Sequence, residues 1–114
     1  IQYEDVTVLG NKSRSYAYCA DTKYDEKIIP FVKDVDVIYH ESTFLEELKS
    51  KASKTKHSTA IQAAKIAFSA NAKMLIIGHF SARYDSVEKF TKEASTIFDN
   101  TIAAYDGFKY QIKI

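Results

Sequence analysis

The sequence predicts an α/β fold, in which one layer of helices covers one sheet. Three observations lead to this prediction. Short apolar runs with the length of buried strands recur along the chain. Segments with the apolar spacing of amphipathic helices lie between them, and turn-forming residues separate the two kinds of segment. No internal repeat or linker divides residues 1–114, so we expect one domain unit and no separate second domain.

Composition agrees with a folded chain, because 46% of the 114 residues are hydrophobic. A net charge of +1 gives no global sign of a nucleic-acid-binding protein, although residues 49–57 carry four lysines and no acid. The single cysteine, Cys19, excludes an intramolecular disulfide and a cysteine-based zinc site, which favours the reducing cytoplasm. No apolar run approaches the ~20 residues of a membrane-spanning helix, so we expect no membrane partner.

The first 20 residues predict a hairpin. Residues 3–9 alternate irregularly, residues 10–13 supply turn chemistry, and residues 15–20 resemble a second strand. Asp21 then lies just beyond the carboxyl end of a strand. Side chains that bind ligands often occupy this position in open α/β sheets.

A short helix and a buried strand are expected next. Residues 27–32 are a helical candidate despite Pro30, and residues 35–39 form an apolar run suited to a buried strand. This strand is expected to deliver His40 and Glu41 to the loop that follows it.

The middle of the chain predicts a helical turn, a loop and a longer helix. Residues 44–48 are expected to form the turn, and the lysine-rich stretch 49–57 the loop. Thr59 and Gln62 have the spacing of a capping box, which predicts a helix from about residue 59 to 70. The side chains expected on its buried face are Ile61, Ala64 and Phe68.

A second strand and helix pair follows. Residues 74–77 predict a buried strand that ends at His79. Asp85 and Glu88 form a second capping-box candidate, which opens a helix to about Phe98. Its expected inward side chains are Val87, Phe90, Ala94 and Ile97.

The chain is expected to close on two strands, residues 101–105 and 108–114, around the turn residues Asp106 and Gly107. The predicted element order is therefore ββ-α-β-α-β-α-ββ, one αβ layer.

Two pairs of residues are candidates for chemistry. Asp21 and His79 follow separate strands, and a carboxylate with a neutral imidazole suits zinc, although a catalytic zinc commonly takes three protein ligands. Alternatively, Asp21 caps a turn and His79 is a hydrogen-bonded core histidine. Glu41 could orient the imidazole of His57 and make it a proton donor to a leaving oxygen, or both could be solvated residues. We expect His40 only to position its loop.

A phosphate could bind at the same edge. Arg83 follows His79 by four residues and could place a guanidinium there, with a surface salt bridge as the alternative. Ser58, Thr59 and Ser81 offer hydroxyl groups, and the helix that begins near Thr59 offers a positive end. Capping alone would also explain Ser58 and Thr59.

Taken together and in order, these motifs resemble the carboxy-terminal half of ribonuclease Z. That family is the metallo-β-lactamase-type endonuclease that trims the 3′ ends of precursor tRNA. The resemblance runs from about residue 15 to 112 and rests on the motifs Ala20-Asp21-Thr22, His40-Glu41-Ser42-Thr43-Phe44, His57-Ser58-Thr59-Ala60, His79-Phe80-Ser81-Ala82-Arg83-Tyr84 and Ala103-Ala104-Tyr105-Asp106. It implies one αβ half of an αββα sandwich.

The resemblance also implies roles. Asp21 matches an aspartate that bridges two zinc ions, and His79 matches the last metal-binding histidine. His57 matches the histidine that helps to protonate the departing 3′ oxygen, and Glu41 the acidic residue that supports it; these two form the catalytic pair. Arg83 matches a contact to the substrate phosphate. Ala20 and Ser42 replace the family's frequent glycine and alanine at their positions.

The family's His-x-His-x-Asp-His signature does not occur in these 114 residues. We therefore expect a fragment whose zinc site needs the missing amino-terminal half, and which alone is inactive and binds zinc weakly. The complete protein is expected to be a homodimer that acts on precursor tRNA. Two alternatives remain open: another metallo-β-lactamase-fold hydrolase, or a noncatalytic assembly fragment that contacts RNA through Lys51, Lys54, Lys56 and Arg83.

Overall fold

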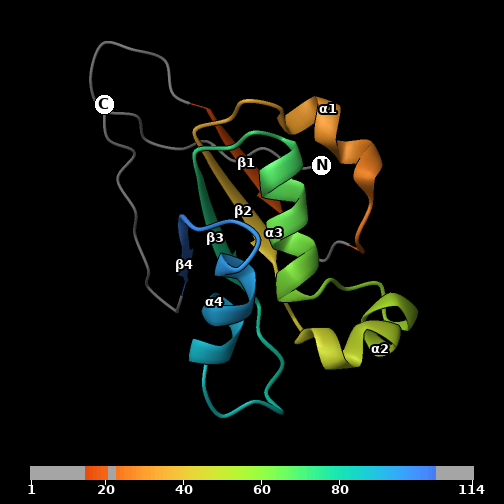
Figure 1. Cartoon of the computed structure of the whole chain (residues 1–114). Helices are drawn as coiled ribbons and strands as arrows, with labels where there is room; N and C mark the ends of the chain where they lie inside the picture. The colour runs from red at the N-terminus through yellow and green to blue at the C-terminus, as the bar shows by residue number, and fades with distance from the viewer. Residues whose placement is uncertain (1–14, 21–22, 105–114) are drawn as a thin grey trace.

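The computed structural model describes residues 15–20 and 23–104, which form a parallel four-stranded sheet with helices packed against it (Figure 1). The strands are β1 (Tyr16–Cys19), β2 (Val37–Glu41), β3 (Met74–Gly78) and β4 (Thr101–Ala103), and they lie side by side in this order. Each neighbouring pair is parallel. The α/β fold class is thus confirmed, and the expected segments 3–9 and 108–114 lie outside the described residues.

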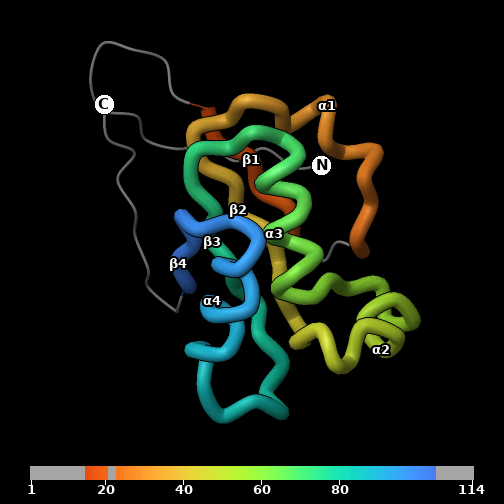
Figure 2. Tube along the Cα trace, in the orientation of Figure 1, coloured from red at the N-terminus to blue at the C-terminus, as the bar shows by residue number. Residues whose placement is uncertain are grey.

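Helices cover one face of the sheet, as the chain trace in Figure 2 shows for α3 and α4. The side chains between these layers form the main apolar core, and Ile38, Leu75 and Ile77 supply its sheet side. Parallel strands need a crossover that returns the chain to the same end of the sheet, and helices packed on one face provide it. All carboxyl ends of the strands therefore lie at one edge.

The opposite face of the sheet carries a second, smaller apolar cluster. Val37 and Ile76 are its buried members, and Tyr39 packs beside them. The Tyr39 ring stacks on Tyr18 with 4.7 Å between ring centroids. It also lies so close to Gly78 that a Cβ atom there would come within 2.5 Å of the Tyr39 hydroxyl oxygen. A larger residue at position 78 would therefore require the Tyr39 ring to move.

Two short helical segments form where the sequence predicts them, and a third forms where a loop was predicted. The segment predicted at 27–32 is the 3₁₀ turn η1 (Glu26–Ile28) followed by α1 (Ile29–Val32), in which Pro30 lies in the first turn, where its missing N–H costs nothing. The 3₁₀ turn η2 (Glu46–Leu48) lies within the turn predicted at 44–48. The lysine-rich stretch is not a loop, however, because α2 (Lys49–Lys54) is helical.

Helix α3 (Ala60–Ser69) begins as predicted, and of its three predicted inward residues only Ala64 is fully buried. Thr59 is its N-cap, and the capping box with Gln62 is present in both directions. The buried stripe consists of small residues, Gln62 and Ile66, whereas Phe68 is 67% exposed and Ile61 only partly buried. The bulky side chains are a poor guide to the buried face of this helix, because its alanines let it pack closely against the sheet. The buried residues are Ala60, Gln62, Ala63, Ala64, Ile66 and Ala67.

Helix α4 (Glu88–Ser95) is shorter than expected and lacks the predicted capping box. Its N-cap is Val87, with no side-chain hydrogen bond, and Ser86 Oγ accepts from the Glu88 amide instead of Asp85. Phe90 and Ala94 are buried as predicted. Val87 is 44% and Ile97 36% exposed, since both lie outside the helix. In the part of the chain that the structure describes, no helix is long and apolar enough to cross a membrane.

Candidate active site

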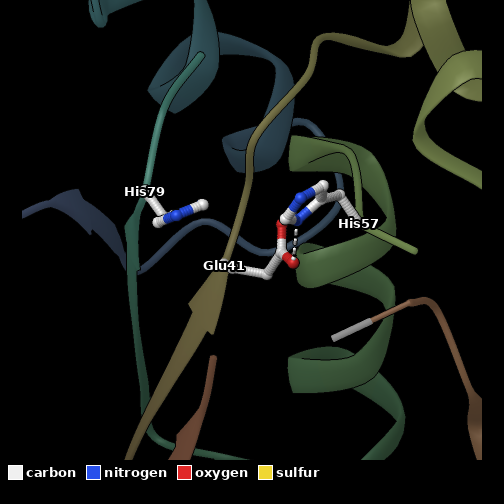
Figure 3. A group of neighbouring side chains, drawn as sticks. All are labelled: Glu41, His57 and His79. Atoms are coloured by element: carbon white, nitrogen blue, oxygen red, sulfur yellow. Dashed lines mark hydrogen bonds and ion pairs between the residues drawn. The ribbon is translucent and has the colours of Figure 1, made fainter. Parts of the chain in front are cut away.

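Three elements bring Glu41, His57 and His79 together at the carboxyl edge of the sheet (Figure 3). Glu41 is the last residue of β2 and pairs in register with Gly78, the last residue of β3, so His79 follows directly beside it. His57 lies just before α3, whose start is held to the chain after β2 by a parallel bridge between Phe44 and Thr59. The parallel register therefore builds this cluster from segments far apart in sequence.

Glu41 is a fully buried carboxylate whose oxygens are held by protein donors. Its Oε1 lies 2.7 Å from Nδ1 of His57. Its Oε2 accepts from the Thr43 hydroxyl at 2.6 Å and from the Ser58 amide at 3.1 Å. Burial of a carboxylate is costly unless such donors surround it, so these bonds fix both its place and its orientation. The prediction that Glu41 lies in a loop is wrong, because it ends a paired strand.

His57 is the exposed partner of this pair. Its side chain is 23% accessible, whereas that of Glu41 is 0% accessible. Because the carboxylate only accepts hydrogen bonds, Nδ1 of His57 donates and the ring's Nε2 is the atom that can exchange a proton with a ligand. The ring stacks against His79 at 5.4 Å between centroids and meets the edge of Phe44 at 6.3 Å. The predicted pairing of Glu41 with His57 is present in the structure.

His79 follows β3 in a left-handed backbone conformation, with φ at 63°. This conformation is uncommon for a residue other than glycine, and such residues gather at functional sites. The imidazole Nδ1 lies 3.0 Å from the Thr43 hydroxyl oxygen. The residue is exposed, so it is not the core histidine of the alternative interpretation.

The cluster is chemically suited to a metal ion, because ligand atoms of Glu41, His57 and His79 all lie within 4.8 Å of one another. The three residues do not suit it equally. Glu41 already accepts hydrogen bonds from three donors, and Nδ1 of His57 is one of these donors. The Nδ1 atom of His79 lies within hydrogen-bond distance of the Thr43 hydroxyl, as is usual for histidines that bind a metal ion through Nε2. Asp21, the other predicted ligand, lies outside the described residues.

The predicted phosphate ligands divide into two groups. Ser58 and Thr59 are fully buried, and Thr59 Oγ1 donates to Glu46 and accepts from the Gln62 amide. Their predicted contact to phosphate would compete with these internal bonds. Ser81 is half-buried and Arg83 is exposed.

The Arg83 guanidinium lies 5.5 Å from the centroid of the Phe44 ring, whose edge meets His57. Within the described residues Arg83 forms no salt bridge, so the alternative surface pair is not seen. The Arg83 guanidinium and the His57 ring therefore both lie against the Phe44 ring, so that one anion could contact both groups.

His40 lies inside β2 and not in the following loop, which corrects the sequence expectation. Its ring is completely buried, and Nδ1 donates to the carbonyl oxygen of Glu41 at 2.8 Å. Burial lowers the pKa of His40 below its ordinary value, because a charged imidazole is poorly solvated there. The bond to Glu41 fits the predicted positioning role.

Sequence reasoning assigned no role to Thr43, which contacts both Glu41 and His79. The one available signal was its place two residues after Glu41, since alternate residues along an extended chain face the same side.

Curated ribonuclease Z proteins are similar to most of this chain. No family model matches the chain. A ribonuclease Z of Cytophaga hutchinsonii is 54% identical over 101 residues, which cover 89% of this chain and 32% of that protein. A ribonuclease Z of Porphyromonas gingivalis is 45% identical over 107 residues, or 94% of this chain and 35% of that protein. The chain spans about a third of the length of these relatives.

Solved structures show the same fold. The metallo-β-lactamase fold protein YhfI from Bacillus subtilis superposes with a TM-score of 0.78 at 28% identity, covering 84% of this chain and 39% of that one. A long form RNase Z from yeast gives 0.70 at 29% identity, covering 80% and 12%, and the short form of human tRNase Z gives 0.60 at 28%, covering 75% and 28%. The predicted resemblance is confirmed: the chain belongs to the ribonuclease Z family and has part of its metallo-β-lactamase fold.

Proposed function

We propose that this chain is the carboxy-terminal part of a zinc-dependent endoribonuclease that removes 3′ trailers from precursor tRNA. The observation that carries the proposal is the 2.7 Å bond between the buried Glu41 carboxylate and Nδ1 of His57, directly beside the exposed His79. The names of the relatives support the same activity over that of another metallo-β-lactamase-fold hydrolase.

In this proposal, His57 donates a proton to the departing 3′ oxygen. Glu41 accepts the Nδ1 proton of the ring and stabilises the charged imidazole, so that Nε2 carries the proton to be donated. Because Glu41 is held by Thr43 and the Ser58 amide, the pair is oriented before a substrate arrives.

His79 and Asp21 would hold zinc next to this pair. When bound, zinc would supply an activated water and positive charge at the phosphate. Arg83, which lies over Phe44, would contact the scissile phosphate, and Ser81 would add a hydroxyl group. Ser58 and Thr59 are better explained as supports of Glu41 and of α3, because they are buried and hydrogen-bonded.

The remaining ligands would come from the amino-terminal part of the protein. The chain covers about a third of its curated relatives, so we propose that it is inactive and binds zinc weakly by itself. The cytoplasmic location and the homodimer of the complete protein are further parts of this proposal.

The proposal is tested with His57→Ala in the complete protein that carries this chain. Loss of a general acid should lower the rate of precursor-tRNA cleavage by about 10²–10⁴-fold. Zinc content, measured by atomic absorption, should stay near the wild-type value, because His57 is bonded to Glu41 and not assigned to the metal. Undiminished cleavage would disprove the proton-donor role.

A second candidate function is RNA binding without catalysis. Helix α2 and the two residues after it expose Lys51, Lys54 and Lys56, and Arg83 is exposed as well. If they alone carried the function, RNA binding would persist with a chelator and fall steeply with salt. A chelator that abolishes cleavage while RNA binding remains would assign the lysines to substrate binding and support the nuclease.

A further inference from the structure

We propose that Thr43 is a positioning residue that joins the metal ligand His79 to the Glu41–His57 pair. This inference rests on the proposed function for the roles of those three residues. The Thr43 side chain is 94% buried and touches both sides of the site: its hydroxyl oxygen lies 2.6 Å from Oε2 of Glu41 and 3.0 Å from Nδ1 of His79.

The chemistry of the hydroxyl group sets the direction of both bonds. A hydroxyl has one proton to donate, and the Glu41 carboxylate can only accept, so the Thr43 proton is directed to Glu41. The short distance is typical of a hydroxyl that donates to a charged oxygen. Thr43 can then only accept from His79, and Nδ1 of His79 must carry a proton.

The consequence is a defined tautomer of His79. With the proton on Nδ1, the lone pair of the neutral ring lies on Nε2, which is the form that binds a metal ion. Glu41 fixes the protonated Nδ1 of His57 in the same way. The buried Glu41 carboxylate thus sets the tautomer of both imidazoles, that of His57 directly and that of His79 through Thr43.

The backbone around Thr43 holds the hydroxyl in place. The Thr43 carbonyl accepts from the Ser81 amide at 2.9 Å, and the Ser42 amide donates to the Gly78 carbonyl at 2.8 Å. Both bonds tie Thr43 to the chain on either side of His79. A β-branched side chain also has few rotamers, so the hydroxyl is pre-oriented. These bonds explain how His79 is kept in its left-handed conformation.

Two substitutions separate the hydroxyl from the shape of the side chain. Thr43→Val keeps the volume and removes the hydroxyl, whereas Thr43→Ser keeps the hydroxyl as the matched control. In the complete protein, Thr43→Val should weaken zinc binding by about 10–100-fold, measured by competition with a chromophoric chelator. Thr43→Ser should remain within about threefold of wild type. Thr43→Ala replaces Thr43→Val if the latter fails to fold.

The tautomer gives a readout that needs neither zinc nor RNA. In the metal-free protein above neutral pH, ¹⁵N imidazole NMR should find His79 in the Nδ1–H form in wild type and Thr43→Ser, and shifted to Nε2–H in Thr43→Val. An Nε2–H form in the wild type, or unchanged tautomer or zinc affinity in Thr43→Val, would overturn the inference. If wild type keeps these properties but does not cleave precursor tRNA, the proposed function fails and the role of Thr43 stands.

Discussion

At the scale of single residues, the site depends on a buried carboxylate that hydropathy does not reveal. Its motif predicts a functional role for Glu41. The burial of its carboxylate and the donors around it follow from the tertiary arrangement of β2, β3 and the start of α3. The pairing with His57 was therefore predictable as chemistry, whereas the hydroxyl bridge to His79 was not, because it depends on the parallel register.

Buried His40 makes a prediction about pH. Its folded-state pKa is lowered below 6.5, so the unfolded chain takes up a proton more readily than the folded one. Stability from this residue is present above the unfolded-state pKa and is lost as the pH falls below about 6.5, by up to about 1.4 kcal/mol per unit.

His40→Asn removes the titratable ring and keeps a donor, since the asparagine amide can donate to the Glu41 carbonyl as Nδ1 of His40 does. Urea unfolding of His40→Asn between neutral and mildly acidic pH should show a shallower loss of the free energy of unfolding than wild type. An equal dependence of the free energy of unfolding on pH in the two proteins would contradict the lowered pKa of His40.

Cys19 is another titratable group whose pKa is changed by burial. Desolvation raises the pKa of its thiol to about 11, so the group stays protonated at neutral pH and is a poor nucleophile. The cysteine therefore belongs to the core between sheet and helices.

At the scale of elements, one of the two predicted capping boxes forms and the other does not. The Thr59–Gln62 capping box is present, yet the similar pattern at Asp85 and Glu88 is not used, since Ser86 makes the local bond. The lysine-rich stretch forms α2 because lysine and alanine favour helices and Ala52 anchors the segment, whereas its charge suggested a loop.

The cap of α3 also predicts a change in stability. Thr59 Oγ1 accepts from the Gln62 amide and donates to Glu46, so Thr59→Ala should lower the free energy of unfolding by about 1–2 kcal/mol. Thr59→Ser keeps both bonds and should cost less than about 0.5 kcal/mol. Chemical denaturation measures the difference, and an equal loss in the two variants would show that the methyl group and not the cap is responsible.

At the scale of the whole molecule, the alternation of apolar strands and helices predicts the α/β layer. The strand order β1-β2-β3-β4 is known only from the structure. The αββα sandwich that the family resemblance implies needs an apolar sheet face opposite the helices, and the structure has one: Val37 and Ile76 are buried there and Tyr39 packs beside them. In the αββα sandwich that the family resemblance implies, the amino-terminal half packs against this face. This sheet would then pack against the sheet of the amino-terminal half and carry the site at its carboxyl edge.

The central claim is that His57, oriented by Glu41, protonates the departing oxygen. The direct measurement compares wild type and His57→Ala in the complete protein on precursor tRNA and on bis(p-nitrophenyl) phosphate, whose leaving group needs no proton. We predict a loss of about 100-fold or more on precursor tRNA and of less than about tenfold on the activated diester. Equal losses on the two substrates would contradict the claim.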